Sequence, residues 1–390
     1  MSIRTPPQPG SPAGDPMPPI PDPEAVSGAL EAWFAGAARD LPWRRARSGY
    51  GALVSEVMLQ QTQVSRVVGP FDAFMARFPS PAALAAAPEP EVLAAWRGLG
   101  YYRRARMLHA AAKSVCERFG GTVPATSAEL RTLPGVGRYT AAAIASIVFG
   151  ERTPIVDGNV VRVLSRLADA PATMGEAATE RWAWEQAARL AGAARAPGAT
   201  NEALMELGAT VCTPAQPACG GCPLAGPCRA RANGTAALRP APRRQGARRT
   251  LRWSVAIDWD GRGVVLERRP STGLWAGLMQ PPTAEGTASD DPDVLARGLG
   301  EGAERIGAFT HVISHRDVEF TVYRVRAGSA AARGERHEAS RLQALPMSNA
   351  ALRALEIAGI PGGAGPVRTP SAPRAARRPG RAGRSASTGS

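Results

Sequence analysis

The sequence is poor in several features, and each shortage narrows what the chain can do. Lys113 is the only lysine among 47 basic residues, so chemistry that uses a lysine amine has almost no candidate. No run of about 18 apolar residues occurs, which argues against a membrane-spanning helix. The N-terminus lacks the basic-then-apolar pattern of a secretory signal, and we therefore expect a cytoplasmic protein.

Positive charge, in contrast, is abundant. The formal net charge is +14 and the sequence pI is about 10.8. Such a balance favours a polyanionic partner, nucleic acid before membrane, and hence a nucleoid-associated location. Part of the excess lies in residues 229–252, with eight arginines, and residues 362–390, with six, neither of which contains an acidic residue. Solvated basic tails would account for that part without any partner.

Changes in composition predict a multidomain protein. Residues 1–24 are rich in Pro and Gly, and we expect them to be disordered. Residues 25–228 carry helical periodicity and predict an all-α domain, which an Arg- and Pro-rich linker follows at 229–250. Residues 251–361 contain alternating apolar positions and predict an α+β domain. The tail, 362–390, is basic and of low complexity, and we expect it to be disordered.

Periodicity also predicts individual elements. The expected helices span 25–39, 51–77, 89–98, 103–119, 127–132, 140–149, 158–168, 176–191 and 200–211. The expected strands span 253–259, 263–268 and 318–325.

The segment Leu133-Pro-Gly-Val-Gly-Arg-Tyr-Thr140 has the properties of a phosphate-binding hairpin. Gly135 and Gly137 flank Val136, so a tight turn can bring backbone N–H groups against an anion. The helix expected after the turn adds free N–H donors and positive partial charge at its N-terminus. A plain glycine turn between two helices is the alternative. The lysine-type phosphate loop and the dinucleotide fingerprint are absent from this segment.

Four of the five cysteines form the pattern Cys212-x6-Cys219-x2-Cys222-x5-Cys228. Disulfides are uncommon in a cytosolic chain. Structural zinc sites commonly use two Cys-x-x-Cys pairs, and only one is present here. Four unevenly spaced thiolates within 17 residues suit a 4Fe-4S cluster better than zinc. Cys116 lies apart in an expected helix, and we expect it to be a buried small hydrophobe.

Two carboxylates stand out by their surroundings. Glu56 has apolar neighbours on both sides in Leu53-Val-Ser-Glu-Val-Met58, and such a carboxyl tends to stay protonated and to act as a general acid. A solvated surface glutamate is the alternative. Asp157 precedes Gly158 and Asn159, where it is either a helix N-cap or a carboxylate facing a sugar. One protonated and one ionised carboxyl group are the parts needed to break a glycosidic bond.

These motifs together resemble a known family. The hairpin, Asp157 and the four-cysteine loop at 212–228 resemble the helix-hairpin-helix DNA glycosylases that carry an iron–sulfur cluster. Within that superfamily the chain resembles the adenine DNA glycosylases (MutY), densely over 25–228 and more thinly over 251–361. The motifs that carry this resemblance are Pro42-Trp43-Arg44, Ser55-Glu-Val-Met-Leu-Gln-Gln-Thr-Gln63, Gly98-Leu-Gly-Tyr-Tyr102, Gly158-Asn159 and Asn201-Glu-Ala-Leu204.

The resemblance implies removal of adenine mispaired with 8-oxoguanine or guanine in double-stranded DNA, by a monomer that contains a 4Fe-4S cluster. Glu56 would protonate adenine N7, and Asp157 would stabilise the sugar cation. Extrusion of the adenine is expected, because its reacting atoms are out of reach inside a duplex. The supporting roles fall to Tyr139 and Asn159 near the carboxylates, and to Trp43, Arg44 and Glu202 around the extruded adenine.

The resemblance also implies how the opposite base is held. Gln61, Thr62, Leu99 and Tyr101 would fill the gap left by the adenine, and an aromatic ring suits wedging into a base step. The amide side chains of Gln60, Gln61 and Gln63 could reach base edges; the alternative is that they simply face water. Family members carry a Nudix-like domain that reads 8-oxoguanine, and here His311-Val-Ile-Ser-His315 would supply Ser314 and His315.

Two departures from the family pattern concern that second domain. Ile313 stands where the family usually has phenylalanine, which keeps an apolar wedge but loses a stacking face; a strand core residue is the alternative. The Glu-rich helix of Nudix hydrolases is missing from 273–305. We therefore predict a reader domain without pyrophosphatase activity.

Two other functions compete with this one. An endonuclease III-like glycosylase/lyase would act on oxidised pyrimidines through a lysine after the hairpin, where this chain has Tyr139. Lys113 falls before the hairpin, so the usual lyase nucleophile is missing and only the N-terminal amine remains. A DNA-binding adaptor without activity would need the hairpin and the basic tails but not the two carboxylates.

Overall fold

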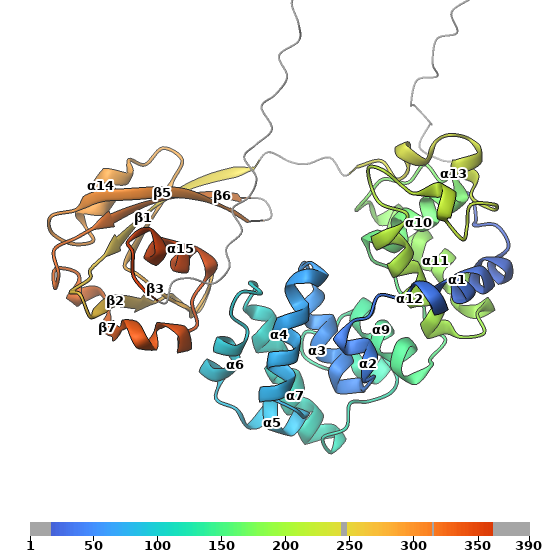
Figure 1. Ribbon diagram of the computed structural model, residues 1–390, viewed down its shortest axis with the longest axis horizontal. Coiled ribbons are helices and arrows are strands. Elements are labelled where there is room, and N and C mark those ends of the chain that lie inside the picture. Colours follow the sequence, from blue (N-terminus) through green and yellow to red (C-terminus); the bar gives the residue numbers. More distant parts are fainter. Residues whose placement is uncertain (1–16, 243–247, 314–315, 362–390) are drawn as a thin grey trace, which may run out of the picture.

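The computed structural model describes residues 17–242, 248–313 and 316–361, and Figure 1 shows them as two helical lobes and a separate β-rich domain. Among these residues no helix is both long and apolar enough to cross a membrane. The helices of the two lobes are α1 (Pro23–Ala37), α2 (Pro42–Arg45), α3 (Gly49–Leu59), α4 (Val64–Arg77), α5 (Pro81–Ala86), α6 (Glu89–Ala95), α7 (Arg103–Phe119), α8 (Ser127–Leu130), α9 (Arg138–Phe149), α10 (Gly158–Ala168), α11 (Ala177–Ala193), α12 (Pro197–Thr210) and α13 (Arg229–Ala232).

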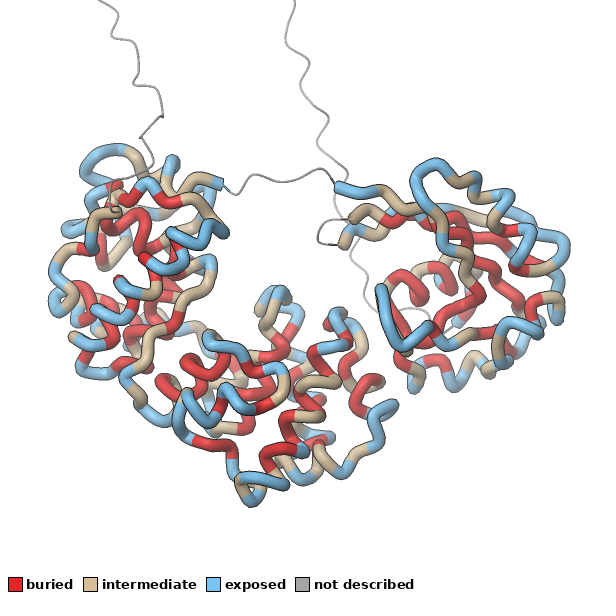
Figure 2. Tube along the Cα trace, turned by 180° about the vertical axis from the view of Figure 1, so that it is seen from behind, coloured by how far each residue is buried: buried red, intermediate tan, exposed pale blue. Residues whose placement is uncertain are grey.

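Each helical lobe has its own apolar core, which Figure 2 shows as buried chain inside an exposed surface. The first lobe packs α3 to α9 around residues such as Leu53, Trp96 and Ile144. The second packs α1 against α10, α11 and α12 around Leu30 and Leu164. The all-α prediction for this part is confirmed. Because α1 belongs to the second lobe, the chain starts in the second lobe, forms the first lobe with α3 to α9, and returns to the second lobe at α10.

The predicted helix over 51–77 is wrong, because the chain breaks at residues 60–63 into α3 and α4. Gln61 has a φ of 54°, which is outside the helical region. The carbonyl oxygens at the end of α3 have another donor available: the guanidinium of Arg104 donates to those of Val57 and Met58. A tertiary contact therefore takes over hydrogen bonds that a continuous helix would have used itself.

Both segments that flank the helical domain contain more structure than their composition suggests. Residues 17–22 pack on the second lobe: Ile20 is 2% exposed, and its N–H donates to Gln186 Oε1 at 3.1 Å. Trp182 Nε1 donates to the Pro18 carbonyl at 3.1 Å. The range 229–250, expected to be a linker, includes α13 and the first residues of a strand.

The β-rich domain contains two sheets. The larger has the strand order β4-β1-β6-β5, with β1 parallel to β6 and antiparallel to β4, and the smaller has the order β3-β2-β7. Figure 1 shows α14 and α15 on opposite sides of the larger sheet. The α+β prediction is confirmed. The elements are β1 (Arg249–Ile257), β2 (Gly263–Arg268), β3 (Met279–Gln280), β4 (Thr283–Thr287), α14 (Pro292–Arg297), β5 (Glu304–Ile313), β6 (Arg316–Arg324), β7 (Glu335–Glu338) and α15 (Asn349–Ile357).

The β-rich domain is docked on the first helical lobe through buried contacts. Leu278, from the loop before β3, is fully buried inside the apolar core of the helical lobe. Tyr102 donates its hydroxyl to the Met347 carbonyl at 2.7 Å, and this hydrogen bond is buried. Arg97 donates to the Gln343 carbonyl at 2.9 Å. The docking therefore combines apolar burial with hydrogen bonds that need a defined geometry.

Candidate active site

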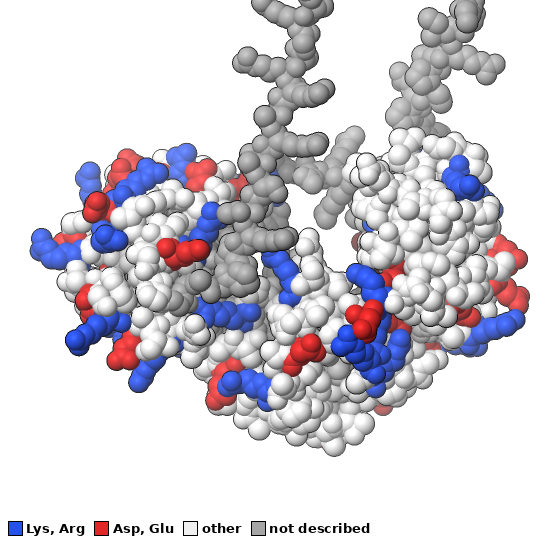
Figure 3. Space-filling model, viewed as in Figure 1, with Lys and Arg blue, Asp and Glu red and all other residues white. Residues whose placement is uncertain are grey.

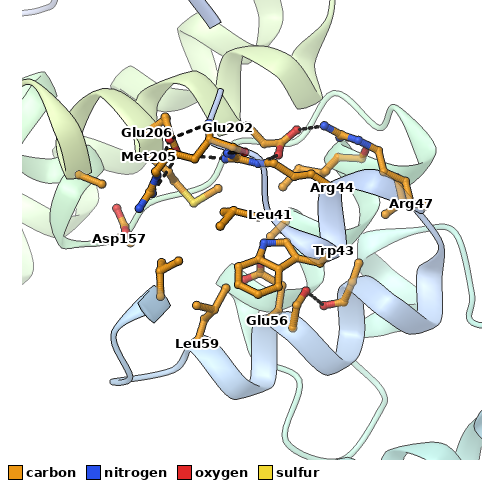
Figure 4. A pocket seen from close by; sticks show the side chains of 18 of the residues that line it. Leu41, Trp43, Arg44, Arg47, Glu56, Leu59, Asp157, Glu202, Met205 and Glu206 are labelled. Carbon is orange, nitrogen blue, oxygen red and sulfur yellow. Dashed lines mark hydrogen bonds and ion pairs between the residues drawn. The ribbon is translucent and has the colours of Figure 1, made fainter. Parts of the chain in front are cut away.

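A pocket of about 230 Å³ lies where the two helical lobes meet. It is smaller than pockets for drug-sized ligands, which begin at about 300 Å³, and so suits a single flat ring system. Its wall brings together the predicted residues Trp43, Arg44, Glu56, Tyr139, Asp157, Asn159 and Glu202, with Thr62 at the edge. Figure 4 shows Glu56 and Asp157 entering from different elements, with Arg44, Glu202 and Glu206 grouped together.

Glu56 points into this pocket from α3 and has an altered acidity. Burial, together with the nearby charges of Asp157 and Glu202, raises the pKa of Glu56 to about 7, against an opposing hydrogen bond from Tyr139. A carboxyl group with a pKa near 7 holds its proton for much of the time at neutral pH and still releases it readily. The geometry therefore favours the general acid over the alternative of a solvated surface glutamate.

Asp157 combines the two roles that its sequence context left open. Its carboxylate caps α10, accepting from the Val160 N–H at 2.7 Å. It also lines the pocket, where Asn159 Nδ2 donates to it at 3.0 Å. Burial raises the pKa of Asp157, while the hydrogen bonds from Val160 and Asn159 oppose that rise. These hydrogen bonds fix the carboxylate in the pocket, where its negative charge can stabilise a positive charge.

Tyr139, at the start of α9, connects the hairpin with the carboxylates. Burial and the charges of Glu56 and Asp157 hold the pKa of its phenol well above the ordinary value, so the side chain remains a neutral donor. Its hydroxyl also lies 3.0 Å from the Met205 sulfur. An exposed Lys113 lies elsewhere, on α7. No lysine amine therefore faces the pocket.

A buried ion network that the sequence analysis missed forms the opposite wall. Glu206 is 1% exposed and accepts from Arg39 and Arg44, with Arg44 Nη2 at 3.1 Å. Arg44 Nε also donates to Glu202 at 3.0 Å, and Arg47 pairs with the other oxygen of Glu202 at 2.6 Å. Burial would raise the pKa of Glu206, but the two arginines outweigh it and lower the pKa below its ordinary value.

One sequence signal could have revealed that network. Glu202 and Glu206 are four residues apart, so they lie on the same face of α12. In Figure 3, Lys and Arg side chains gather with Asp and Glu side chains at the junction of the two helical lobes. Arg39 and Arg44 both pair with Glu206. The carboxylates thus hold cationic side chains beside a pocket that already contains acids.

The hairpin has the geometry expected of a backbone anion grip. Gly135 has a φ of 75°, and a Cβ there would stand only 2.5 Å from Met107 Cβ, so glycine is required. Val136 turns into the core of the first lobe, while Gly135 and Gly137 remain exposed. Gly137 caps α9, so free N–H groups at the helix start face solvent.

The remaining predicted residues line a second, larger space between the helical domain and the β-rich domain. This cleft measures about 950 Å³, and Gln61, Thr62, Leu99 and Tyr101 lie along its helical side. Tyr101 is 45% exposed. Ile313 lines the other side as the last residue of β5 and is partly buried, so it is a strand residue at the cleft and not a fully buried core residue. Ser314 and His315 lie outside the described residues.

The four cysteines of the 212–228 loop lie beside the second lobe, and three of them, Cys212, Cys222 and Cys228, pack against its apolar core. Burial, with smaller contributions from the other three cysteines, raises the pKa of the Cys222 thiol to about 11. Arg166 Nη1 lies 3.4 Å from Cys212 Sγ. Among the described residues, no His, Cys, Asp or Glu side chains are arranged as a closed metal site. Four thiols on one short loop nevertheless fit an iron–sulfur cluster in type and number. Cys116 is partly exposed on α7, not buried as expected.

Comparisons with protein families match both parts of the chain. The model of the HhH-GPD superfamily of base excision DNA repair proteins matches residues 54–189, and that of the NUDIX domain matches residues 252–357. The first range runs from α3 into α11, so it covers most of the first helical lobe and part of the second, and the second range covers most of the β-rich domain.

Curated relatives point to one activity. The adenine DNA glycosylase of Mycolicibacterium smegmatis is 45% identical over 243 residues, covering 61% of this chain and 78% of that protein. That of Mycobacterium tuberculosis is 43% identical over 211 residues, covering 54% of this chain and 69% of that protein. The human adenine DNA glycosylase is 48% identical over 216 residues, covering 53% of this chain. The chain spans only 39% of the human protein.

Proposed function

The chain belongs to the adenine DNA glycosylase family, and on that premise we propose that it hydrolyses the N-glycosidic bond of adenine mispaired with 8-oxoguanine or guanine in double-stranded DNA. The observation that carries the proposal is the placing of Glu56, with its pKa near 7, beside Asp157 and Tyr139 in one pocket. An acid near neutrality and a fixed carboxylate are what cleavage through an oxocarbenium-like state requires.

In the proposed reaction Glu56 moves the proton and Asp157 stabilises the charge on the sugar. Glu56 gives its proton to adenine N7, and the bond from C1′ to the base breaks with its electron pair leaving on the adenine. Asp157 stabilises the positive charge that develops on the sugar. A water molecule then adds to C1′, and its proton passes to the ionised Glu56, which restores the acid. Tyr139 remains neutral and can donate its hydroxyl proton to the ionised Glu56.

The opposite wall of the pocket would hold the extruded base. Arg44 offers N–H donors and Glu202 offers acceptor oxygens, which match the ring nitrogens and the amino group of adenine. Trp43 packs edge-on against Phe71, with ring centroids 5.5 Å apart, and gives the pocket an apolar wall. The ion network around Glu206 keeps Arg44 in place when DNA is absent.

The same pocket argues against strand cleavage by a lyase step. That chemistry needs an amine that attacks C1′, and Tyr139 occupies the position after the hairpin. Lys113 faces solvent on α7. We therefore propose a monofunctional, monomeric enzyme that leaves an intact abasic strand, and a cytoplasmic, nucleoid-associated location.

Two further assignments complete the proposal. Cys212, Cys219, Cys222 and Cys228 would hold a 4Fe-4S cluster that stabilises the loop after α12. The β-rich domain would read the base opposite adenine through Ser314 and His315, without pyrophosphatase activity. Replacing both residues by alanine should reduce the preference for 8-oxoguanine over guanine opposite adenine, and an unchanged preference would remove the β-rich domain from lesion reading.

One incubation separates the competing functions. The purified protein is mixed with a duplex that contains a single A:8-oxoguanine pair, and half of each sample is then treated with hot alkali. Breakage at the adenine only after alkali supports the proposal. Breakage without alkali would favour a lyase, and an uncut duplex that still binds would favour an adaptor. A duplex with a T:8-oxoguanine pair is the matched control and should remain intact.

A further inference from the structure

Arg104 is a buried cation that does not pair with an acid. It lies at the start of α7 and is 9% exposed, and its hydrogen bonds among the described residues go to backbone carbonyl oxygens and one hydroxyl oxygen. Burial lowers the pKa of Arg104 to about 10, so the side chain keeps its charge at neutral pH. Burying a charge without an ion-pair partner costs free energy, and the hydrogen bonds of Arg104 to neutral groups offset this cost.

Its two terminal nitrogens connect two separate segments. Nη1 donates to the carbonyl oxygens at the end of α3 and just beyond it, namely those of Val57 at 3.0 Å, Met58 at 2.8 Å and Gln60 at 2.5 Å. Nη2 donates to Thr62 Oγ1 at 3.1 Å and to the carbonyl oxygens of Leu99 at 3.0 Å and Gly100 at 3.1 Å. One planar group therefore fixes residues 57–62 against residues 99–100.

In or next to each segment, one non-glycine residue has a strained backbone with a positive φ. Gln61 has a φ of 54° and Tyr101 a φ of 46°, and this left-handed region is unfavourable for residues that carry a side chain. The Arg104 guanidinium also lies 5.5 Å from the ring centroid of Tyr101 and 5.5 Å from that of Trp96. The Arg104 guanidinium, with the hydrogen bonds that it makes to residues 57–62 and 99–100, is called the clamp below. It contacts the Tyr101 ring as well as the backbone next to Tyr101.

These two segments are the helical side of the cleft, and α3 also carries Glu56. We propose that Arg104 is a positioning residue for base extrusion: its guanidinium holds the Tyr101 wedge and the Gln61–Thr62 turn in one rigid unit with the helix that carries the acid. The inference rests on the proposed glycosylase function. Arg104 itself lines neither the pocket nor the cleft, so it acts through the loops.

Arginine is needed for this arrangement because it presents donors in a fixed fork. A lysine keeps the charge but offers one ammonium group, which cannot reach both segments from the same stem. Arg104→Lys therefore tests the bridge with the charge preserved, and Arg104→Met removes both. Lys113→Met is the matched control, because it removes one positive charge from an exposed position on the same helix.

The experiment measures extrusion apart from chemistry. The full chain is mixed in a stopped-flow instrument with a duplex that carries 2-aminopurine in place of the target adenine, opposite 8-oxoguanine, and its fluorescence reports unstacking. For Arg104→Lys we expect extrusion to fall about tenfold, with single-turnover excision of adenine falling by a similar factor and duplex affinity changing less than about threefold. Lys113→Met should extrude the base like the wild type.

A purely structural role gives a different result. Each variant is therefore also tested on adenine opposite tetrahydrofuran, which offers no base to hold. A loosened clamp should reduce the advantage of 8-oxoguanine over tetrahydrofuran, whereas a general loss of stability would lower both rates equally and overturn the proposal. Extrusion at the wild-type level in Arg104→Lys would also overturn it. If the wild type neither extrudes nor releases the base, the proposed function itself has failed.

A second variant covers the case in which the Arg104 variants do not fold. Gly100 has a φ of 70° and nothing within 4 Å of a Cβ placed there, so Gly100→Ala strains only the loop backbone. We expect the same loss of extrusion from this variant, with Arg104 unchanged. Normal extrusion by a folded Gly100→Ala would show that the loop geometry is not limiting and would refute the proposal.

Discussion

The acidity of Glu56 has a consequence for stability that can be measured without any substrate. Its pKa is raised from an ordinary 4.5 to about 7 in the folded protein, because burial and two neighbouring carboxylates disfavour the charge. Below about pH 4.5 the group is protonated in both the folded and the unfolded protein and does not lower the free energy of unfolding. As the pH rises from 4.5 to 7, the unfolded chain releases this proton before the folded protein does, so the free energy of unfolding falls. Glu56→Gln removes the charge, so the variant should be the more stable protein at high pH.

The magnitude follows from the shift. Each pKa unit corresponds to about 1.4 kcal/mol, and the ionisation of the unfolded chain begins near pH 4.5. The gain in unfolding free energy for Glu56→Gln should therefore be about 1 kcal/mol at pH 5 and about 3 kcal/mol at pH 8.5. Glutamine retains a similar volume and can still accept from Tyr139, so packing changes contribute little.

The assay is urea unfolding followed by far-ultraviolet circular dichroism, which reports mainly the helical domain, at the two pH values. Glu117→Gln, at an exposed position on α7, is the matched control and should show no such rise with pH. A Glu56→Gln gain that stays constant between pH 5 and pH 8.5 would refute the raised pKa, and with it the main support for Glu56 as the acid. The same variant should bind lesion DNA and release no adenine.

Three other substitutions test separate parts of the site. Asp157→Asn keeps a good helix cap and should leave stability within about 0.5 kcal/mol while excision falls sharply, whereas Asp157→Ala should also cost about 1 kcal/mol of unfolding free energy; equal stability of the two would disprove the capping role. Glu206→Gln leaves two arginines without their shared carboxylate and should cost about 3 kcal/mol in thermal or urea unfolding, and an unaltered melting temperature would contradict the network. Gly135→Ala should weaken DNA binding, measured by fluorescence anisotropy, and destabilise the fold by about 1–3 kcal/mol through its positive φ and its clash with a methionine, whereas Gly137→Ala, which has open space, is the milder control.

The parts of the structure that could be predicted are those with a local cause. The helix at 103–119 was predicted with the same boundaries as α7, because apolar periodicity and Gly120 at its end are both visible in the sequence. Asp157 before Gly158 is likewise a local capping signal. Motifs at fixed spacing also grouped eight of the residues that line the pocket, among them Glu56, Tyr139 and Asp157.

The parts that were missed depend on contacts distant in sequence. Nothing local at residues 60–63 signals a helix break, since its partner is Arg104, more than forty residues away. Glu206 and Arg39 are 167 residues apart, and only the fold makes them a pair. Short strands such as β3, with two residues, have too little sequence for a period to be recognised. Tertiary hydrogen bonding, not propensity, decided each of these positions.

Leu278 links the synthesis of the two halves of the protein. The first helical lobe is translated by about residue 149, yet its apolar core includes a side chain that follows some 130 residues later. At about 5–20 residues per second, the ribosome needs roughly 7–26 s to supply it. During that interval the apolar position that Leu278 fills in the first lobe stays uncovered, and exposed apolar surface of this kind favours aggregation. Arrival of the β-rich domain covers this position, so the last step of folding also removes the chain's own aggregation hazard.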